Sequence, residues 1–319
     1  MARGINYNYK IRRFLEILRE NEYETGENIA KDLGISRAAV SKFAKYLKNL
    51  GYSFEIKKRY KLLESPDIPF PWELGNMGEK VIFFYEVDST QNVARELFIK
   101  RKLKENFWVI ALRQTSGKGR LGRRWESPEG NFYGSCVIRP EIPIKEVIKI
   151  SLLGGLAVFK TIQSFSPIYD VKIKWPNDVF VIRREPKKIS GTIAEAFGEA
   201  EKIDFVVVGI GVNVKVSPLD ISISLKDIVN NPSSVFLVEF TKKLIGYFAE
   251  VYGDFCEGKW LKLKTEIENN LWRGKVKVDT GRKSFSGICY GIAEDGSMIV
   301  QKEDGSFEMV YYGDTLIYS

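Results

Sequence analysis

The sequence predicts an α+β protein built in three successive parts: a helical N-terminal segment, a central mixed sheet with helices, and a small C-terminal β-domain. Apolar residues recur at helical spacing within residues 1–64, short strands alternate with helices over 79–270, and short strands separated by polar turns fill 271–319. The chain has 319 residues, of which 44% are hydrophobic and 28% charged, so it is long and apolar enough for separate cores.

Three helices are expected in the N-terminal segment. Apolar residues repeat at helical spacing over residues 11–18 and predict the first helix. The second begins after Thr25, a suitable N-cap, and ends at Gly34, while the third begins after Ser36 and ends at Gly51. Two short helices joined by Leu-Gly-Ile-Ser predict a helix-turn-helix.

A hairpin and an excess of positive charge complete this segment. Residues 52–63 alternate between apolar and polar side chains around a Lys-Lys-Arg tip, so that 1–64 resembles a winged helix-turn-helix. Residues 1–64 carry 14 Lys and Arg against 8 Asp and Glu, which favours binding to DNA phosphates. The candidate DNA-binding residues are Arg37, Ser41, Lys42, Lys45 and Lys58. The alternative is a protein interaction module.

The composition excludes several kinds of active site. The chain has no histidine, which removes Ser-His-Asp and Cys-His nucleophilic sites and histidine-ligated metals. Cys136, Cys256 and Cys289 lie far apart without Cys-x-x-Cys spacing, so neither a disulfide framework nor a metal site is predicted. These cysteines, a start without an apolar leader, and an apolar run limited to 150–159 indicate a cytoplasmic protein with no membrane partner.

The remaining elements follow from periodicity and turn signals. Residues 65–78 are punctuated by proline and are expected to form a linker. The expected strands of the central part are 81–87, 107–115, 131–140, 171–175, 179–184, 189–198 and 205–214. The expected helices are 88–101, capped by Asp88 or Ser89, then 145–166, and 236–260. From Trp272, four strand segments predict a small barrel that resembles an SH3 domain.

The segment Gln114–Asn131, QTSGKGRLGRRWESPEGN, interleaves glycines with cations. Glycine lets the backbone approach a ligand closely, and clustered Lys and Arg side chains repel one another unless an anion is present. One interpretation is a solvated basic turn, and the other is a loop that orders around phosphate. The pattern differs from a P-loop and from the dinucleotide fingerprint because its cations alternate with its glycines.

Four further motifs lie at predicted strand ends or turns. They are Asp-Ser-Thr at 88–90, Lys-Trp-Pro-Asn-Asp at 174–178, Lys-Lys-Ile-Ser-Gly at 187–191 and Gly-Ile-Gly-Val-Asn at 209–213. The first offers donors at a helix N-terminus, and the third sets a lysine beside a strand and a glycine that permits close approach. Each also has a plain structural interpretation as a cap, a turn, a solvated lysine or a relief of crowding.

The order and spacing of these motifs resemble the biotin protein ligase family, specifically its bifunctional members that carry a helix-turn-helix and act as biotin-dependent repressors. The resemblance covers nearly the whole chain, and the basic loop with its tryptophan and the motif at 174–178 are its most specific parts. It implies a mixed-sheet ligase domain of the class II synthetase type over 79–270 and an SH3-like domain over 271–319. One departure is Lys118, which stands where the family loop usually has arginine, so the charge is kept but the bidentate fork is lost.

The resemblance implies roles for individual residues. Those matching the biotin site are Ser89, Thr90, Gln114, Gly117, Lys118, Arg120, Lys188 and Gly191. Those matching the nucleotide site are Arg120, Arg123, Trp125, Asn177, Lys188 and Asn213. Lys188, Arg120, Asp178 and Lys118 are the implied catalytic residues, and no metal-ligand set is predicted.

The implied reaction uses ATP, Mg²⁺ and biotin to form biotinyl-5′-adenylate, from which biotin passes to a lysine of a biotin carboxyl carrier protein. The other implied partners are operator DNA and a second copy of the chain, a homodimer formed when the adenylate is bound. Two alternatives stay open: a lipoate or octanoate ligase of related fold, and a ligand-sensing regulator without ligase activity. The first lacks the alternating Gly/Arg loop, and the second would not need a catalytic lysine.

Overall fold

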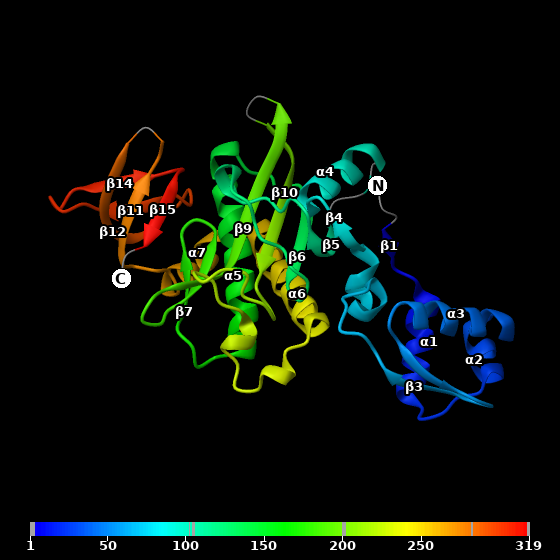
Figure 1. Cartoon of the computed structure of the whole chain (residues 1–319). Coiled ribbons are helices and arrows are strands. Elements are labelled where there is room, and N and C mark those ends of the chain that lie inside the picture. Colours follow the sequence, from blue (N-terminus) through cyan, green and yellow to red (C-terminus); the bar gives the residue numbers. More distant parts are fainter. Residues whose placement is uncertain (1–3, 102, 104–105, 200–201, 282, 318–319) are drawn as a thin grey trace. The chain divides into compact units, whose positions relative to one another are not determined.

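The computed structural model describes residues 4–101, 103, 106–199, 202–281 and 283–317. The chain forms two compact units that divide between Phe83 and Phe84. The first contains helices and a hairpin, and the second contains a large sheet, the helices that cover it and a small second sheet (Figure 1). This is a mixed α+β architecture, as the sequence predicts.

The N-terminal unit has three helices followed by an antiparallel two-stranded sheet. Its elements are β1 (Ile5–Asn6), α1 (Tyr9–Glu20), α2 (Gly26–Leu33), α3 (Arg37–Asn49), β2 (Ser53–Ile56) and β3 (Tyr60–Glu64), of which only β1 was not predicted. The Thr25 hydroxyl accepts from the Asn28 N–H at 3.2 Å, and the Ser36 hydroxyl accepts from the Ala39 N–H at 3.2 Å. Both predicted N-caps, the three helices and the hairpin are therefore confirmed.

The segment 65–78, expected as a linker, is packed into this unit. It runs into a 3-10 helix, η1 (Pro71–Lys80), and Phe70, Trp72 and Leu74 are 0%, 3% and 0% exposed. The prolines shape the backbone here, whereas the apolar side chains between them bury surface against the rest of the unit. Proline spacing alone does not reveal that burial.

A buried polar network joins α1, the hairpin and η1. Glu73, which is 8% exposed, accepts hydrogen bonds from the Tyr52 hydroxyl at 2.5 Å and from Arg19 Nη2 at 2.9 and 3.0 Å. Trp72 Nε1 donates to the Tyr52 hydroxyl at 2.8 Å. Burial, together with the neighbouring Glu73 carboxylate, raises the pKa of Tyr52, so its hydroxyl stays a donor at neutral pH.

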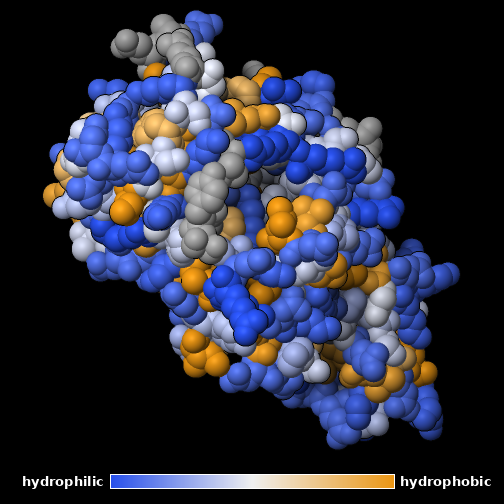
Figure 2. Space-filling view, turned by 60° about the vertical axis from the view of Figure 1, so that its left-hand side comes forward, coloured by the Kyte–Doolittle hydropathy of each residue, from blue (hydrophilic) through white to orange (hydrophobic). Residues whose placement is uncertain are grey.

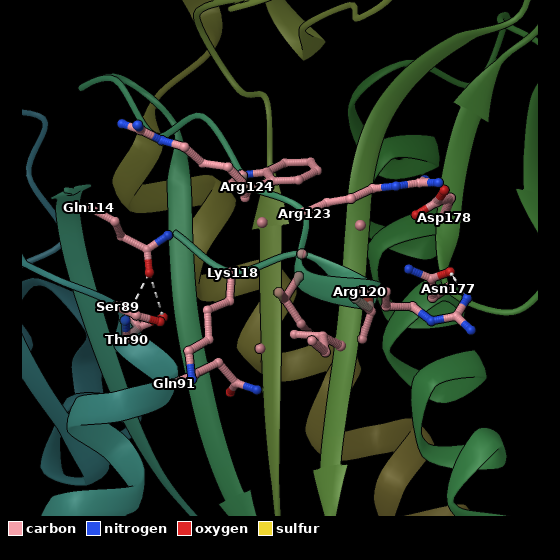
Figure 3. Close-up of a pocket in the computed structure, with 18 of the residues that line it drawn as sticks. Ser89, Thr90, Gln91, Gln114, Lys118, Arg120, Arg123, Arg124, Asn177 and Asp178 are labelled. Carbon is pink, nitrogen blue, oxygen red and sulfur yellow. Dashed lines mark hydrogen bonds between the residues drawn. The ribbon is translucent and has the colours of Figure 1, made fainter. Parts of the chain in front are cut away.

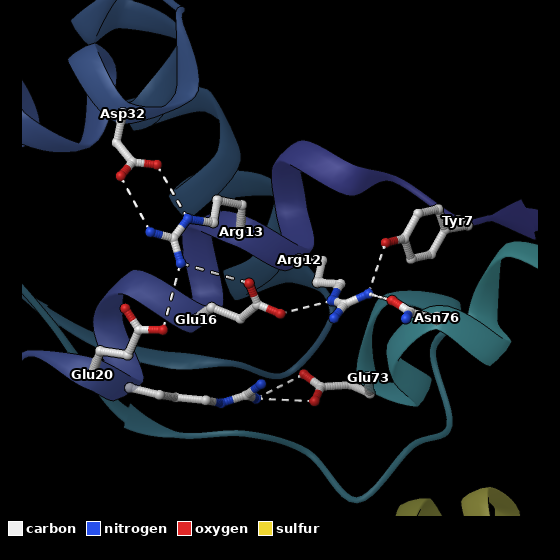
Figure 4. Close-up of polar contacts among 9 residues, drawn as sticks. Tyr7, Arg12, Arg13, Glu16, Glu20, Asp32, Glu73 and Asn76 are labelled. Carbon is white, nitrogen blue, oxygen red and sulfur yellow. Dashed lines mark hydrogen bonds and ion pairs between the residues drawn. The ribbon is translucent and has the colours of Figure 1, made fainter.

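Other arginines of α1 make ion pairs at the surface of the same unit (Figure 4). Arg13 pairs with Asp32 of α2 at 3.2 Å, and Arg12 donates to Glu16 at 2.7 Å and to Asn76 of η1 at 2.6 Å. These exposed pairs contribute little stability one by one, but they join α1 to the elements on either side of it.

The second unit is built on one large sheet. After β1, which pairs with the first residues of β4, its strands lie in the order β4 (Val81–Val87), β5 (Phe107–Gln114), β6 (Phe132–Ile138), β10 (Lys202–Val212), β9 (Lys187–Glu199), β8 (Asp178–Val181) and β7 (Val171–Lys174). From β5 to β7 each neighbouring pair is antiparallel. All seven predicted strands are present.

Helices cover both faces of this sheet. The helices are α4 (Thr90–Arg101), α5 (Val147–Phe165), α6 (Leu237–Cys256) and α7 (Trp260–Asn269). On one face, Phe205 of β10 meets Phe98 of α4, with ring centroids 4.6 Å apart. On the other, Thr192 of β9 lies so close to Gly154 of α5 that a Cβ on that glycine would come within 2.5 Å. Because side chains alternate along a strand, successive residues of one strand face α4 and α5 in turn.

The small second sheet has five strands, one more than the sequence predicts. They are ordered β14 (Phe307–Val310), β13 (Met298–Gln301), β12 (Ser284–Ile292), β11 (Lys275–Asp279) and β15 (Asp314–Ile317). The segment read as one strand from Phe307 onward is divided at Gly313, whose φ of +129° few side chains adopt. The turn there separates β14 from β15.

One helical segment, Ile144–Phe165, is long and apolar enough to cross a membrane, but it is 72% buried inside the fold. Its apolar character therefore serves core packing. The face in Figure 2 is mostly hydrophilic, and its hydrophobic residues form small separate groups.

The polar network around Tyr52 predicts that removing one hydroxyl group lowers the stability of the N-terminal unit. We expect Tyr52→Phe to destabilise the N-terminal unit by about 2 kcal/mol, because Glu73 and Trp72 lose a partner in a buried place. Hydrogen exchange of residues 4–83 in the full chain measures this. Tyr46→Phe, at a side chain that is 41% exposed, is the matched control and should change stability by less than about 0.5 kcal/mol. Equal effects of the two substitutions would contradict the prediction.

Candidate active site

A pocket opens on the α4 face of the large sheet, across β9 and β10 and beneath the basic loop between β5 and β6 (Figure 3). It encloses about 130 Å³. Of the predicted site residues, it is lined by Ser89, Thr90, Gln114, Lys118, Arg120, Arg123, Trp125, Asn177, Asp178, Lys188 and Gly191. Together with Gly209 and Gly211, which also line it, residues from all five motifs meet in one place.

Two glycines form the flat floor of this pocket. Gly191 of β9 and Gly211 of β10 lie directly opposite each other in the strand register. The indole of Trp125 lies over both: a Cβ on Gly211 would come within 2.6 Å of the ring, and one on Gly191 within 3.2 Å. Any side chain at either position would fill the space that a flat group now occupies.

Neutral polar groups gather at one end of the pocket. The side-chain oxygen of Gln114, Oε1, accepts from the Thr90 N–H at 2.8 Å, and the Thr90 hydroxyl lies 2.8 Å from the Ser135 hydroxyl. Gln114 of β5 thus takes the first N–H of α4, while the carboxylate of Asp88, one of the two predicted caps, accepts from the Asn92 side chain at 2.6 Å. The hydroxyl of Ser89 is buried and has no hydrogen-bond partner among the described residues. It is therefore available to a ligand.

The basic loop is folded rather than extended. Gly119 N–H donates to the Arg123 carbonyl at 2.7 Å, and Arg123 N–H donates to the Arg120 carbonyl at 3.1 Å. Leu121 and Gly122, at φ +55° and +74°, turn the chain between them. Arg120 Nη1 donates to Asn177 Oδ1 at 3.0 Å, so the loop reaches the 174–178 turn (Figure 3).

An ion pair lies at the other end of the pocket. Lys188 Nζ is 2.7 Å from Asp178 Oδ1, and Lys174 Nζ is 3.8 Å from Asp178 Oδ2. Burial alone would raise the pKa of Asp178, but the charges of Lys188, Lys174 and Arg120 outweigh it and lower that pKa below the usual range. Lys188 also lies 5.3 Å from the centre of the Trp125 ring. This end of the pocket is charged and suited to an anion.

Gly117 and Asn213 are the two predicted ligand-site residues that do not line this pocket. A Cβ on Gly117 would come within 2.4 Å of the Trp125 carbonyl, so this glycine allows the loop to fold back. Asn213 is 1% exposed, and its Oδ1 has no partner among the described residues.

Two residues that border the pocket, Gln91 and Thr192, were not predicted from the sequence. Gln91 is 3% exposed, and its side chain lies against Gly209, where a Cβ would come within 2.9 Å. Thr192 of β9 borders the pocket, but its side chain packs against Gly154 of α5 on the opposite face of the sheet. The signal for Gln91 was its place directly after Asp-Ser-Thr. Thr192 gave no local signal, since only strand pairing brings it to the site.

The donor set fits a ligand with a neutral polar head and an anionic tail. Buried side-chain oxygens without a partner among the described residues lie at one end, and the cationic side chains lie at the other. Between them, Gly191 and Gly211 have no side chains to fill the space. No group of three or more Cys, Asp or Glu side chains that would suit a metal ion occurs within the described ranges.

Comparisons with known proteins show which family the chain resembles. A profile of the biotin/lipoate A/B protein ligase family matches residues 83–213. The chain is 30% identical over 315 residues to the bifunctional ligase/repressor BirA of Bacillus subtilis, covering 92% of this chain and 94% of that protein. It is 25% identical to the protein of the same name from Escherichia coli, covering 91% and 92%. Matches that cover this much of the chain necessarily include most of the N-terminal unit.

A solved structure is similar to part of the chain. The biotin protein ligase from Aquifex aeolicus in complex with biotin and ATP matches with a TM-score of 0.63 and 28% identity. The match covers 75% of this chain and 99% of that one.

The ion pair predicts how stability depends on pH. Since the pKa of Asp178 is lowered by folding, its carboxylate stabilises the protein above the unfolded-state pKa of about 3.9, and this is lost as pH falls through the lower folded value. Asp178→Asn should therefore lower the free energy of unfolding by about 3 kcal/mol. This difference from the wild type should be the same between about pH 7 and pH 5 and should become smaller only below about pH 4.

Urea unfolding across that pH range tests this expectation. Asp170→Asn is the control, because the Asp170 carboxylate is 57% exposed beside Lys172. This substitution should change the free energy of unfolding by less than about 0.5 kcal/mol. A difference for Asp178→Asn that already declines above about pH 5 would mean that the carboxylate is not held by the lysines.

Proposed function

The chain belongs to the biotin protein ligase family, and on that premise we propose that it joins biotin to a lysine of a carrier protein at the expense of ATP and represses transcription by binding DNA. The observation that carries the ligase half is the convergence of Lys188, Asp178 and the basic loop around one pocket. The full-length match to bifunctional ligase/repressors carries the repressor half.

The neutral end of the pocket is assigned to the ring system of biotin. Gln114 and Thr90 are already positioned by each other, and Gln114 Nε2 donates to the Ser127 hydroxyl at 3.0 Å. The unpaired Ser89 hydroxyl adds a donor and an acceptor for a cyclic urea. Gly117 lies beside this end, where a Cβ would come within 3.0 Å of Gln114 Nε2.

The charged end is assigned to the carboxylate of biotin and the phosphates of ATP. Lys188 and Lys118 would meet the carboxylate, and Arg120 and Arg123 the phosphates. Trp125 would cover the base, with Asn177 and Asn213 nearby. The flat floor of Gly191 and Gly211 accepts an aromatic ring, since it now holds one.

The reaction has two steps. The carboxylate of biotin attacks the α-phosphorus of ATP, a new oxygen–phosphorus bond forms, and pyrophosphate leaves. A carrier lysine amine then attacks the acyl carbon, loses a proton and expels AMP. Neither step needs a histidine or a protein nucleophile, but both need cations between groups that repel each other. Lys188, paired with Asp178, supplies that neutralisation.

Mg²⁺ would come with ATP and would neutralise charge on its phosphates. Asp178 and Asn177 are the nearest side-chain oxygens to that end of the pocket, but Asp178 is already shared between two lysines. The side chains therefore suit a metal bound mainly through the nucleotide.

The N-terminal unit is assigned to DNA as a winged helix-turn-helix. Arg37, Ser41, Lys42 and Lys45 are exposed along one side of α3, while Val40, Ala44 and Leu47 are buried on the other. Lys58 is exposed at the tip between β2 and β3. A helix for the major groove and a hairpin for the backbone are what this fold presents.

Several finer features are also proposed. The acceptor is a biotin carboxyl carrier protein, the ligand-bound chain forms a homodimer, and the protein acts in the cytoplasm. The small five-stranded sheet is an SH3-like domain. The domains we propose are 1–64 for DNA, 79–270 for the ligase and 271–319 for the small β-domain, with 65–78 between the first two.

The ligase function is tested by ATP–pyrophosphate exchange with biotin, lipoate, octanoate or no acid. We expect exchange with biotin only. Lys188→Ala should reduce it by at least about 100-fold, because the cation aimed at the developing charge is lost. Lys187→Ala, the adjacent lysine outside the pocket, is the control and should retain activity. Exchange with lipoate or octanoate would indicate a lipoate or octanoate ligase instead. No exchange with any acid would indicate a ligand-sensing regulator without ligase activity.

The DNA-binding assignment predicts a change in salt dependence. Binding to a pool of random-sequence duplexes, measured over a salt series with biotin and ATP present, should weaken when Lys42 and Lys45 are both replaced by alanine. Each lost phosphate contact should lower the slope of log K against log salt by about 1. Lys10→Ala, at an exposed residue of α1, should leave the slope unchanged. An unchanged slope in the double variant would exclude this face of α3.

A further inference from the structure

One buried side chain outside the pocket fastens the segment that follows β10. Asn131 lies directly before β6 and is 1% exposed. Its Oδ1 accepts from the three consecutive N–H groups of residues 214–216, at 2.9, 3.1 and 3.0 Å. Its Nδ2 donates to the Val216 carbonyl at 3.0 Å. Four hydrogen bonds from a single side chain therefore fix three residues of backbone, and burial keeps water from competing for them.

Residues 213–226 form a compact loop whose two ends pair with each other. The Asn213 carbonyl accepts from the Leu225 N–H, and the Val214 carbonyl accepts from the Lys226 N–H, both at 2.9 Å. A loop with closed ends moves as one body rather than residue by residue. The four bonds from the asparagine lie where the chain leaves β10, so they hold this loop at its base.

The same loop is bonded to the backbone of Lys188 and of the residue after it. Lys188 N–H donates to the Ile221 carbonyl at 3.1 Å, and the Lys188 carbonyl accepts from the Ile223 N–H at 3.0 Å. At the base of the loop, the Asn213 N–H donates to the Ile189 carbonyl at 2.9 Å. Both ends of the loop therefore bond to the first residues of β9, and a shift of the loop would move the backbone from which the Lys188 side chain extends.

We propose that Asn131 is a positioning residue for Lys188: it holds the 213–226 loop, and the loop holds the backbone of Lys188 where the ammonium group meets Asp178 and the carboxylate of the substrate. Asn131 is not among the residues that line the pocket, so it acts through the loop and touches no reacting atom. The proposal rests on the proposed ligase function and adds to it a residue outside the pocket that sets the geometry of the reaction.

The contacts allow matched variants. Asn131→Ala removes all four bonds, whereas Asn131→Asp keeps an acceptor for the three N–H groups and loses only the donor to Val216. Val216 is 39% exposed, so water can replace that donor. Ser166→Ala is the control in the same unit: Ser166 is 3% exposed and donates to the Ile228 carbonyl at 2.6 Å, just beyond the loop. If Asn131→Ala does not fold, Asn131→Ser, with a shorter acceptor, takes its place.

The first measurement compares kcat for ATP–pyrophosphate exchange with Kd for biotin in the full chain. Asn131→Ala should lower kcat at least about tenfold, because a displaced ammonium group stabilises the transition state less, and should leave Kd for biotin within about threefold. Asn131→Asp should keep kcat within about threefold of the wild type, and Ser166→Ala within about twofold. An unchanged kcat in Asn131→Ala, or an equal loss in Asn131→Asp or Ser166→Ala, would overturn the proposal.

The second measurement needs no catalysis. Lys215 is a trypsin site at the base of the loop, and it is present in every variant. Asn131→Ala should speed cleavage after Lys215 in the ligand-free chain about tenfold, and Asn131→Asp and Ser166→Ala should not. Equal cleavage rates in Asn131→Ala and the wild type would show that the asparagine does not hold the loop, whatever the exchange activity. A wild-type chain without exchange activity would instead reject the ligase function on which the proposal rests.

Discussion

The ion pair between Lys188 and Asp178 is the contact around which the charged end of the pocket is built. A lysine facing a pocket needs a carboxylate to hold its direction, and a carboxylate that is 8% exposed needs cations to stay ionised. Strand register brings the two together, since Asp178 lies opposite Gly191 on the neighbouring strand, three residues from Lys188. The backbone of Lys188 is held as well: its N–H donates to Ile221 and its carbonyl accepts from Ile223. The sheet therefore fixes the ammonium group more firmly than a loop would.

The space above this ion pair exists because side chains are missing. Gly191 and Gly211 face each other, and Gly209 lies two residues along the same face of β10. Glycine at such positions weakens a sheet, since it packs nothing and costs backbone entropy. Here Trp125 lies over the first two and Gln91 over the third. The sheet gives up local stability to form a flat surface, which a ring from the protein or from a ligand can cover.

Local patterns in the sequence predicted elements and motifs well, because caps, alternation and glycine act over a few residues. Thr25 and Ser36 are N-caps as expected, and the 174–178 turn meets Lys188 as the family resemblance implies. The failures are nonlocal. Gln114 bonds the first N–H of α4 because β5 ends beside that helix. The segment with Phe70 and Trp72 is buried because the N-terminal unit offers an apolar surface for it to pack against. No residue near Gly313 signals its bond to Arg120, which lies 193 positions away along the chain.

A chain without histidine can still catalyse acyl activation because the work is electrostatic. Proton transfer near neutral pH would call for an imidazole, whereas bringing a carboxylate to a phosphate calls for permanent cations. The pocket separates neutral from charged groups in space: Gln114 and Thr90 are hydrogen-bonded to each other at one end, and Lys188 and the basic loop lie at the other. In the proposed function, the first end would recognise a neutral head and the second would meet charge. An acid bound with its head in the neutral end must direct its carboxylate to Lys188. Binding specificity and reaction geometry therefore follow from the same division of the pocket.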